Sequence, residues 1–243
     1  MAKLISQSGT KEHKVVSPKS WIAARKALLV KEKKFTLLRD QLSKQRRALP
    51  WVKVENEYIF DGPQGKETLA DLFISKSQLV VYHFMFAPEV ETGCPHCSFW
   101  ADHYDGIVAH LNQRDVSFVV ISRAPLAKLD AFKNRMGWKF KWVSSAQTAF
   151  NYDFQASFSE EDIKNATSYY NYAKVKMDAR DREGISVFYK DGDGDIYHTY
   201  STYARGIDMV NSTYQFLDLV PKGRDEDPKD PQDWVRYHDR YKR

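Results

Sequence analysis

Residues 79–100 read LVVYHFMFAPEVETGCPHCSFW and contain the two features that decide the fold. The first is a continuous apolar run over 79–86, which has the length and composition of a buried strand in a parallel sheet. The second is a Cys-x-x-Cys pair, Cys94 and Cys97, which opens a helical pattern and holds the only two cysteines among 243 residues. A strand that leads through a loop into a dithiol at the start of a helix indicates a redox site.

The segments that follow predict alternating strands and helices. Residues 95–113 have the apolar spacing of a helix, 117–122 form a second buried strand, and 126–136 form a second helix. A hairpin is expected over 185–200, where Asp-Gly pairs separate two strand-like runs, and a last helix over about 206–217. This order predicts an α/β, thioredoxin-like fold with an N-terminal helical extension and an insertion before the C-terminal β-hairpin.

The composition of the chain suggests four parts. Residues 1–16 are polar and mixed and are interpreted as a flexible tail, and 17–50 as a basic amphipathic helix. The thioredoxin-like domain covers 51–220, and 221–243 form a charged C-terminal tail. Within the domain, residues 146–182 are irregular and rich in Asn, Asp, Ser and Tyr, which predicts an insertion.

The N-terminal helix is bounded by clear signals and is strongly basic. Ser17 suits the cap, Pro18 suits the first helical position, and Pro50 ends the pattern. Residues 11–47 contain 12 Lys and Arg and 3 Asp and Glu, a net charge of +9 within a chain of net charge +5. The helix could contact an acidic membrane surface. It could also dock on the domain with its basic face in solvent, or serve as the arm of a homodimer. We do not expect nucleic-acid binding, because no aromatic or glycine pattern of such a module accompanies the charge.

Length and composition indicate a globular protein. A chain of 243 residues with 42% apolar content can bury a full core. Residues 1–16 lack the apolar stretch of a signal peptide, and the longest apolar run, 79–88, is too short to span a bilayer. We therefore expect a cytoplasmic protein without a membrane span. In that compartment an isolated Cys-x-x-Cys is more often catalytic or metal-binding than structural.

The predicted position of the dithiol suggests its chemistry. Cys94 falls at the cap of a helix, where the partial positive charge favours a thiolate and lowers the cysteine pKa. A thiolate attacks disulfides, and a second cysteine close by resolves the mixed disulfide that forms. We therefore predict that Cys94 is the nucleophile and Cys97 the resolving residue. Pro95 fixes the turn into the helix, and a charged His96 would stabilise the thiolate.

Two alternatives for the cysteine pair stay open, a structural zinc site and a pair of inert buried thiols. Structural zinc takes four ligands, and the sequence has no second cysteine pair. His96, His103 and His110 recur every seven residues, but at about 1.5 Å per residue His110 lies about 20 Å from the helix start. That is too far to share a metal with Cys94. We predict neither a metal nor a cofactor.

Arg123 is a second candidate for the site. It follows the strand 117–122, and the carboxyl ends of parallel strands share one edge of a sheet. The strand before Cys94 ends at the same edge, so Arg123 could hold an anion or stabilise the thiolate. The alternative is a surface arginine paired with an acidic side chain.

Several stretches of the chain match a known family. They include WIAARKALL at 21–29, CPHCSFWAD at 94–102, SRAPL at 122–126 and YSTYARG at 200–206. On these residues the chain resembles the family catalogued as domain of unknown function 899, whose members are thioredoxin-like. By fold analogy the resemblance implies thiol–disulfide exchange or peroxide reduction, with a disulfide or peroxide substrate and an unknown thiol reductant. A thioredoxin-like binding module without turnover is the alternative.

One departure from the thioredoxin pattern concerns substrate docking. Thioredoxins place a cis-proline beside the dithiol, just before the first strand of the hairpin. Here no proline occurs between Pro125 and Pro221, so either Gly184 and Ile185 or Ser186 are expected at that place. Gly184 and Ile185 are candidate substrate contacts.

A second departure concerns the peroxiredoxin pattern Pro-x-x-x-Thr-x-x-Cys. Pro88 and Thr92 have the required separation, but Cys94 comes one residue early. Thr92 is thus a candidate hydrogen-bond donor to the thiolate, and Trp100 in the following helix is a further candidate contact.

Overall fold

The computed structural model describes residues 4–5 and 13–242 and divides into two compact units. One unit comprises the chain up to Pro50 together with 213–226, and the other comprises 51–212 and 227–243. Most of the predicted tail lies outside the described residues. Its described parts, β1 (Leu4–Ile5) and β2 (His13–Lys14), pair antiparallel.

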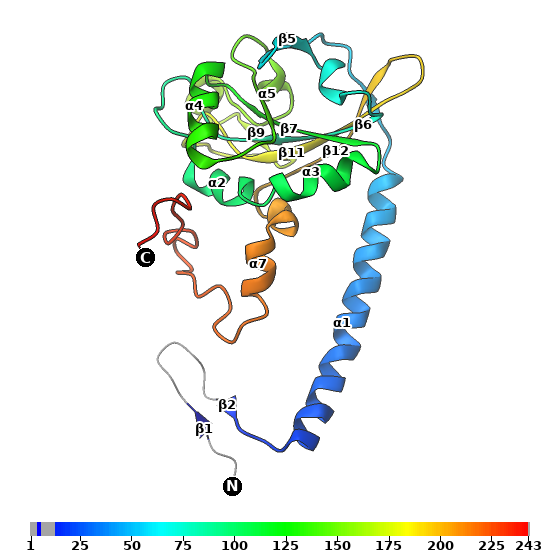
Figure 1. Ribbon diagram of the computed structural model, residues 1–243, viewed down its shortest axis with the longest axis vertical. Helices are drawn as coiled ribbons and strands as arrows, with labels where there is room; N and C mark the ends of the chain where they lie inside the picture. The colour runs from blue at the N-terminus through cyan, green and yellow to red at the C-terminus, as the bar shows by residue number, and fades with distance from the viewer. Residues whose placement is uncertain (1–3, 6–12, 243) are drawn as a thin grey trace. The chain divides into compact units, whose positions relative to one another are not determined.

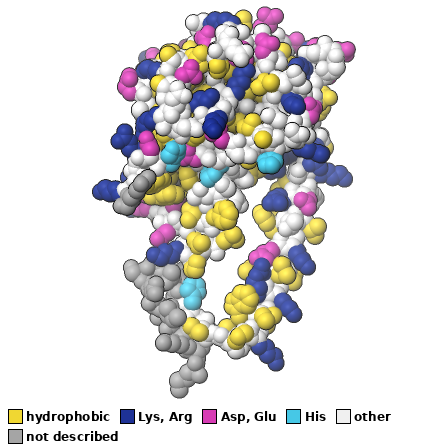
Figure 2. All heavy atoms as spheres, in the orientation of Figure 1, with side chains coloured by type: hydrophobic (Ala, Val, Ile, Leu, Met, Phe, Trp, Pro, Cys, Tyr) yellow, Lys and Arg dark blue, Asp and Glu magenta, His cyan; other side chains and the backbone are white. Residues whose placement is uncertain are grey.

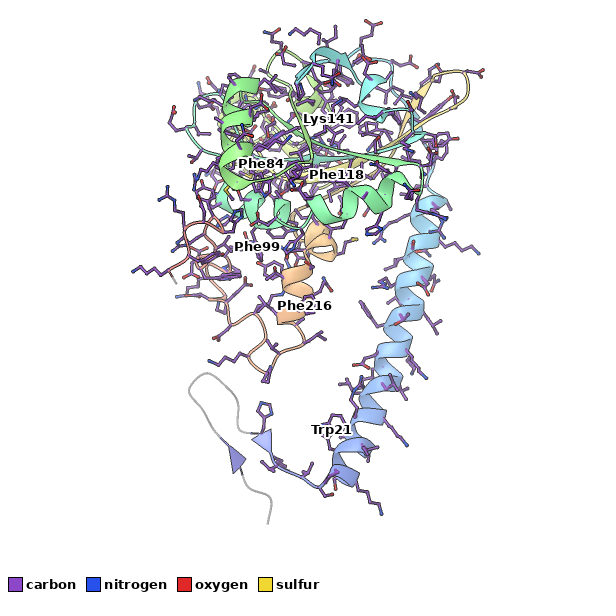
Figure 3. All side chains as sticks on the ribbon, viewed as in Figure 1. Trp21, Phe84, Phe99, Phe118, Lys141 and Phe216 are labelled. Carbon is purple, nitrogen blue, oxygen red and sulfur yellow. The ribbon has the colours of Figure 1, made fainter. Side chains whose placement is uncertain are left out.

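The smaller unit contains the predicted basic helix as α1 (Pro18–Arg47), which Figure 1 labels. Ser17 is the N-cap and accepts a hydrogen bond from the backbone N–H of Ser20 at 3.2 Å. None of the helix residues is buried, and Figure 2 shows Lys and Arg side chains interspersed with hydrophobic ones along it. The helix leaves Trp21, labelled in Figure 3, 60% exposed. Its use as a dimer arm stays a prediction.

The larger unit is built on one eight-stranded sheet with the spatial order β3-β12-β11-β6-β7-β8-β4-β5. The central strands β6, β7 and β8 run parallel, and β11 runs antiparallel to both β6 and β12. The strands are β3 (Val52–Lys53), β4 (Ile59–Gly62), β5 (Gly65–Thr68), β6 (Gln78–His83), β7 (Val116–Ser122), β8 (Lys141–Ser144), β11 (Gly184–Lys190) and β12 (Ile196–Tyr203).

The strand order confirms the predicted fold class. A hairpin, β11 and β12, lies antiparallel on one side of β6, and the parallel strand β7 lies on the other. This is the thioredoxin-like arrangement, extended by β8 and the hairpin β4–β5. The other elements of the larger unit are η1 (Asp71–Phe73), α2 (Pro95–Ala101), α3 (Asp105–Asn112), α4 (Leu126–Met136), α5 (Phe150–Asp153), α6 (Glu160–Asn165), β9 (Tyr169–Tyr170), β10 (Ala173–Lys174) and η2 (Ala204–Val210). The helix α7 (Ser212–Leu217) follows, and all but its first residue belong to the smaller unit.

Aromatic side chains bind the helices to one face of the sheet. Tyr104, at the start of α3, packs against Tyr82 of β6 and Phe118 of β7 at ring distances of 5.0 and 4.9 Å. Phe132 of α4 packs against Trp142 of β8 on the same face. Right-handed crossovers between successive parallel strands place their helices on one side of a sheet, so α2, α3 and α4 form one layer. Figure 3 labels Phe118 of β7 and Phe84, which follows β6.

A second core covers the opposite face. Leu79 and Val81 of β6 are fully buried there with Phe73 of η1 and Phe150 of α5. Because both faces are covered, the continuous apolar run at 79–86 lies at the centre of the sheet, as a buried parallel strand should.

Two predicted helices are interrupted. The helix expected at 95–113 is two helices, α2 and α3, because polar bonds to distant residues hold the break. Asp102 accepts from Trp138 Nε1 at 2.8 Å, and Asp105 accepts from the backbone N–H of Phe140 at 2.8 Å. The helix expected over 206–217 is η2 followed by α7, with the fully buried Asn211 between them.

The C-terminal segment is bonded into the larger unit. Tyr237 donates to the carbonyl oxygen of Gly93 at 2.6 Å, and His238 Nδ1 lies 2.7 Å from Asp102 Oδ1. Val235 is only 2% exposed. These contacts attach the segment, as far as residue 242, to the rest of the larger unit. Among the described residues, no helix combines the length and the apolar character needed to cross a membrane.

Candidate redox site

The dithiol lies where the chain leaves β6 and enters α2. Cys94 is the N-cap of α2 and Pro95 is its first residue, as the sequence predicted. The backbone N–H of Cys94 donates to the Met85 carbonyl at 3.1 Å, and the Cys94 carbonyl accepts from the Ser98 N–H at 3.0 Å. Gly93 is required just before, since a Cβ at that position would lie 2.6 Å from a ring carbon of Phe84.

The Cys94 sulfur is placed to carry negative charge. The pKa of Cys94 is lowered by hydrogen bonding from the Cys97 thiol and from the backbone N–H groups of Cys97 and His96. The Cys97 bond is the largest influence and lowers the pKa of Cys94, while burial and the negative charge of Glu183 oppose it. The net direction is downward, as expected of a thiol at a helix N-terminus.

The second thiol has the opposite character. Cys97 is 2% exposed, and burial raises its pKa well above the ordinary value. Its sulfur accepts from the backbone N–H of Met85 at 3.4 Å. Both cysteines are free thiols. The pair therefore combines a partly exposed thiol whose pKa is lowered with a buried thiol whose pKa is raised.

A cavity of about 340 Å³ opens beside the two sulfurs. Met85 and Trp100 line it on the side of β6 and α2. The other walls come from distant parts of the chain, and their residues are Tyr170, Arg182, Glu183, Ala204, Arg205, Asp208 and Gln232. The cavity is large enough for a small substrate group to reach Cys94.

Four of the predicted site residues meet in this cavity: Cys94, His96, Cys97 and Trp100. His96 is exposed in the first turn of α2. Trp100 is buried and donates from Nε1 to the Ile207 carbonyl at 3.0 Å, which ties α2 to η2.

Thr92 and Arg123 are not among the lining residues. Thr92 is exposed, and its hydroxyl lies 3.1 Å from Tyr237 Oη. Arg123 is 8% exposed and donates to Asp181 from Nε at 2.7 Å and from Nη2 at 3.2 Å. Arg123 is thus paired with an acidic side chain, as the alternative prediction expected. That prediction placed the pair on the surface, whereas it is buried.

Gly184 and Ile185 are built into β11 and do not line the cavity. Gly184 is opposite His83, and a Cβ on it would lie 2.4 Å from a ring carbon of Tyr203. All peptide bonds of the described residues are trans. The residue that faces the dithiol just before the hairpin is Glu183.

Sequence reasoning missed the far wall of the cavity. Tyr170 and Arg182 come from the predicted insertion, and Glu183 follows it directly. Arg205 and Asp208 come from η2. The available signal was a charged pair, Arg182 and Glu183, immediately before the first hairpin strand, at the place where the expected proline is absent.

The cysteine pair has no companion metal ligands in the part of the chain that the structure describes. Over residues 4–5 and 13–242, no group of three or more His, Cys, Asp or Glu side chains is arranged to hold a metal ion.

A protein-family model matches nearly the whole chain. Residues 10–241 match the family described as "Bacterial protein of unknown function (DUF899)", so the chain belongs to that family. A search of curated proteins gave no match.

Solved structures with similar folds include three peroxiredoxin-type proteins. Peroxidoxin BcpB from Mycobacterium tuberculosis is 16% identical, with a TM-score of 0.45, and the match covers 67% of this chain and 94% of that one. A Xanthomonas campestris peroxiredoxin Q mutant is 14% identical, with a TM-score of 0.45 and coverage of 66% and 89%. Peroxiredoxin 6 of Arenicola marina is 12% identical, with a TM-score of 0.43 and coverage of 64% and 65%.

Proposed function

We propose that this member of the DUF899 family is a thiol–disulfide oxidoreductase in which Cys94 attacks and Cys97 resolves. One observation carries the proposal. Cys94 is the N-cap of α2 and borders an open cavity together with Cys97, and hydrogen bonding at this helix start lowers the pKa of Cys94. Thiolates held in this way are the reactive species in disulfide exchange.

The reaction proceeds in two exchanges. The Cys94 thiolate attacks one sulfur of a disulfide, forms a mixed disulfide and releases the first thiolate. Cys97 then loses its proton and attacks the Cys94 sulfur, which releases the second thiolate and leaves the Cys94–Cys97 disulfide. Two electrons pass from the dithiol to the substrate. A dithiol reductant returns the pair to the reduced form, and the cytoplasm is the compartment we propose for this cycle.

The test is reduction of a small disulfide by the full-length protein, with dithiothreitol as the reductant. We expect turnover above the rate of dithiothreitol alone and none with Cys94→Ser. The reduced Cys97→Ser variant, mixed with the disulfide after removal of dithiothreitol, should accumulate a mixed disulfide at Cys94, visible as a mass increase equal to one substrate half. Turnover that survives Cys94→Ser contradicts the assignment.

Hydrogen peroxide in the same assay separates thiol peroxidase activity from disulfide exchange. Attack on peroxide would convert Cys94 to a sulfenic acid and release water, and Cys97 would then condense with it. Faster turnover with peroxide than with any disulfide would replace the proposed function by that alternative. If the thiols react with neither substrate, the remaining alternative is a thioredoxin-like binding module without turnover.

A further inference from the structure

In the described part of the chain, a carboxylate that forms no ion pair lines the cavity beside the dithiol. Glu183 lines the cavity with Cys94 and Cys97 and is half-buried. Among the described residues, the polar side chain bonded to this carboxylate is Tyr170, whose hydroxyl lies 3.4 Å from Oε1. The same hydroxyl makes a closer bond, 2.9 Å, to the Glu183 carbonyl. The carboxylate is therefore only weakly held by the protein.

The two arginines of the cavity have acidic partners of their own. Arg182 forms an ion pair with Asp178 and also donates to the carbonyl oxygen of Asp181 at 3.2 Å. Arg205 contacts Asp208 at 3.4 Å, and its side chain is 87% exposed. Glu183 is thus the lining carboxylate that balances neither arginine.

The position of Glu183 opposes the chemistry of the dithiol. Its negative charge raises the pKa of both Cys94 and Cys97, whereas exchange needs each of them as a thiolate. A half-buried carboxylate is also costly to desolvate without a partner. A cationic group of a bound ligand would offset the effect of Glu183 on the cysteine pKa values and the desolvation cost of its carboxylate.

We propose that Glu183 binds a positively charged group beside the sulfur–sulfur bond of the substrate. The inference rests on the proposed function and narrows its substrate class to small disulfides with an ammonium group close to sulfur. The bound ammonium neutralises the carboxylate at the moment when Cys94 must carry charge.

The exchange is balanced as follows. The Cys94 thiolate attacks the sulfur nearer the bound ammonium, that half-molecule becomes linked to Cys94, and the other leaves as an aminothiolate. Cys97 gives its proton to water and attacks the Cys94 sulfur. The Cys94–Cys97 bond forms, the bond from Cys94 to the linked half breaks, and that half leaves as a second aminothiolate. The substrate gains two electrons, the dithiol becomes a disulfide, and dithiothreitol reduces it in the assay.

The first experiment compares disulfides of similar size and different charge. Full-length protein is assayed with cystamine, which is cationic, 2-hydroxyethyl disulfide, which is neutral, and dithiodipropionate, which is anionic. We expect Glu183→Gln to lower kcat/KM for cystamine relative to 2-hydroxyethyl disulfide about tenfold, the effect of losing a charged hydrogen bond in a partly screened site. Comparing variants on each substrate cancels the intrinsic reactivity of the disulfides.

A matched control removes a carboxylate elsewhere. Glu161 is exposed on α6 and is not a lining residue of the cavity, so Glu161→Gln should leave the substrate ratio unchanged. An unchanged ratio in Glu183→Gln as well would overturn the proposal.

The second experiment does not require turnover. Aminoethyl and sulfonatoethyl methanethiosulfonate each transfer a thioalkyl group to the Cys94 thiolate and release methanesulfinate. We expect the rate advantage of the aminoethyl reagent to fall about tenfold in Glu183→Gln. Charge selectivity without disulfide turnover would support the cation site and contradict the proposed function. Turnover without charge selectivity would overturn the cation site alone.

Discussion

Asp181 and Glu183 stand two residues apart and use the same chemical group in different ways. Asp181 is 8% exposed and is held by a bidentate bond from Arg123 and by the Ser157 hydroxyl at 2.6 Å. Glu183 faces the dithiol cavity with one long contact to Tyr170. The first carboxylate is saturated by the protein and serves the fold. The second is the carboxylate for which we propose a ligand, so the comparison sets a structural charge against a proposed functional one.

The largest effect is expected from the dithiol itself. Cys94→Ser should reduce disulfide turnover to the uncatalysed rate, because serine supplies no thiolate at neutral pH. The urea unfolding midpoint should stay close to that of the parent protein. A large loss of stability would mean that Cys94 is a structural residue like Asp181, and it would contradict the distinction between structural and functional groups.

The next effect should appear at Asp181. Asp181→Asn leaves the Arg123 guanidinium buried without its counter-charge, and breaking such a pair costs about 3–5 kcal/mol. Urea unfolding followed by tryptophan fluorescence measures the loss. A change below about 1 kcal/mol would contradict a structural role for the ion pair.

A surface ion pair from the same segment supplies the control. Arg180 contacts Glu160 at 3.1 Å, and the two side chains are 39% and 82% exposed. Glu160→Gln should therefore change the free energy of unfolding by no more than about 1 kcal/mol, as solvent screens the pair.

A smaller effect on stability is expected at Glu183, with a shift in reactivity instead. Glu183→Gln should change the free energy of unfolding by about 0.5 kcal/mol or less. It should also lower the pKa of Cys94, because the carboxylate raises it. The alkylation rate of Cys94 should then reach half its maximum at a lower pH than in the parent protein. A midpoint that moves upward would show that Glu183 does not act on Cys94 through its charge.

The fold could be predicted because its signals are local. The apolar run at 79–86 identifies the central strand, and the paired Asp-Gly turn identifies the hairpin of β11 and β12. The break between α2 and α3 could not be predicted from periodicity. It depends on Asp102 and Asp105, which bond to Trp138 and to the backbone beyond it, more than 30 residues later.

In the candidate site, too, the residues set by local sequence could be predicted, and those brought in by long-range contacts could not. Cys94 and Cys97 are brought together by their spacing and by the helix that starts at Pro95. Glu183 and Tyr170 reach the cavity only through the path of the insertion and β11, and neither belongs to a motif. Arg123 directly follows β7, as the sequence predicted. Its side chain is bonded to a partner distant in the sequence, Asp181, and does not line the cavity.

The central claim is that Cys94 is an activated thiol paired with a buried resolving thiol. The most direct test is the pH dependence of alkylation by iodoacetamide, with mass spectrometry to locate the modified residue. We expect modification at Cys94, with a midpoint below the value of about 8.5 for a free cysteine, and a reversible Cys94–Cys97 disulfide in glutathione buffers. A midpoint at or above about 8.5, with no disulfide formed, would contradict the account.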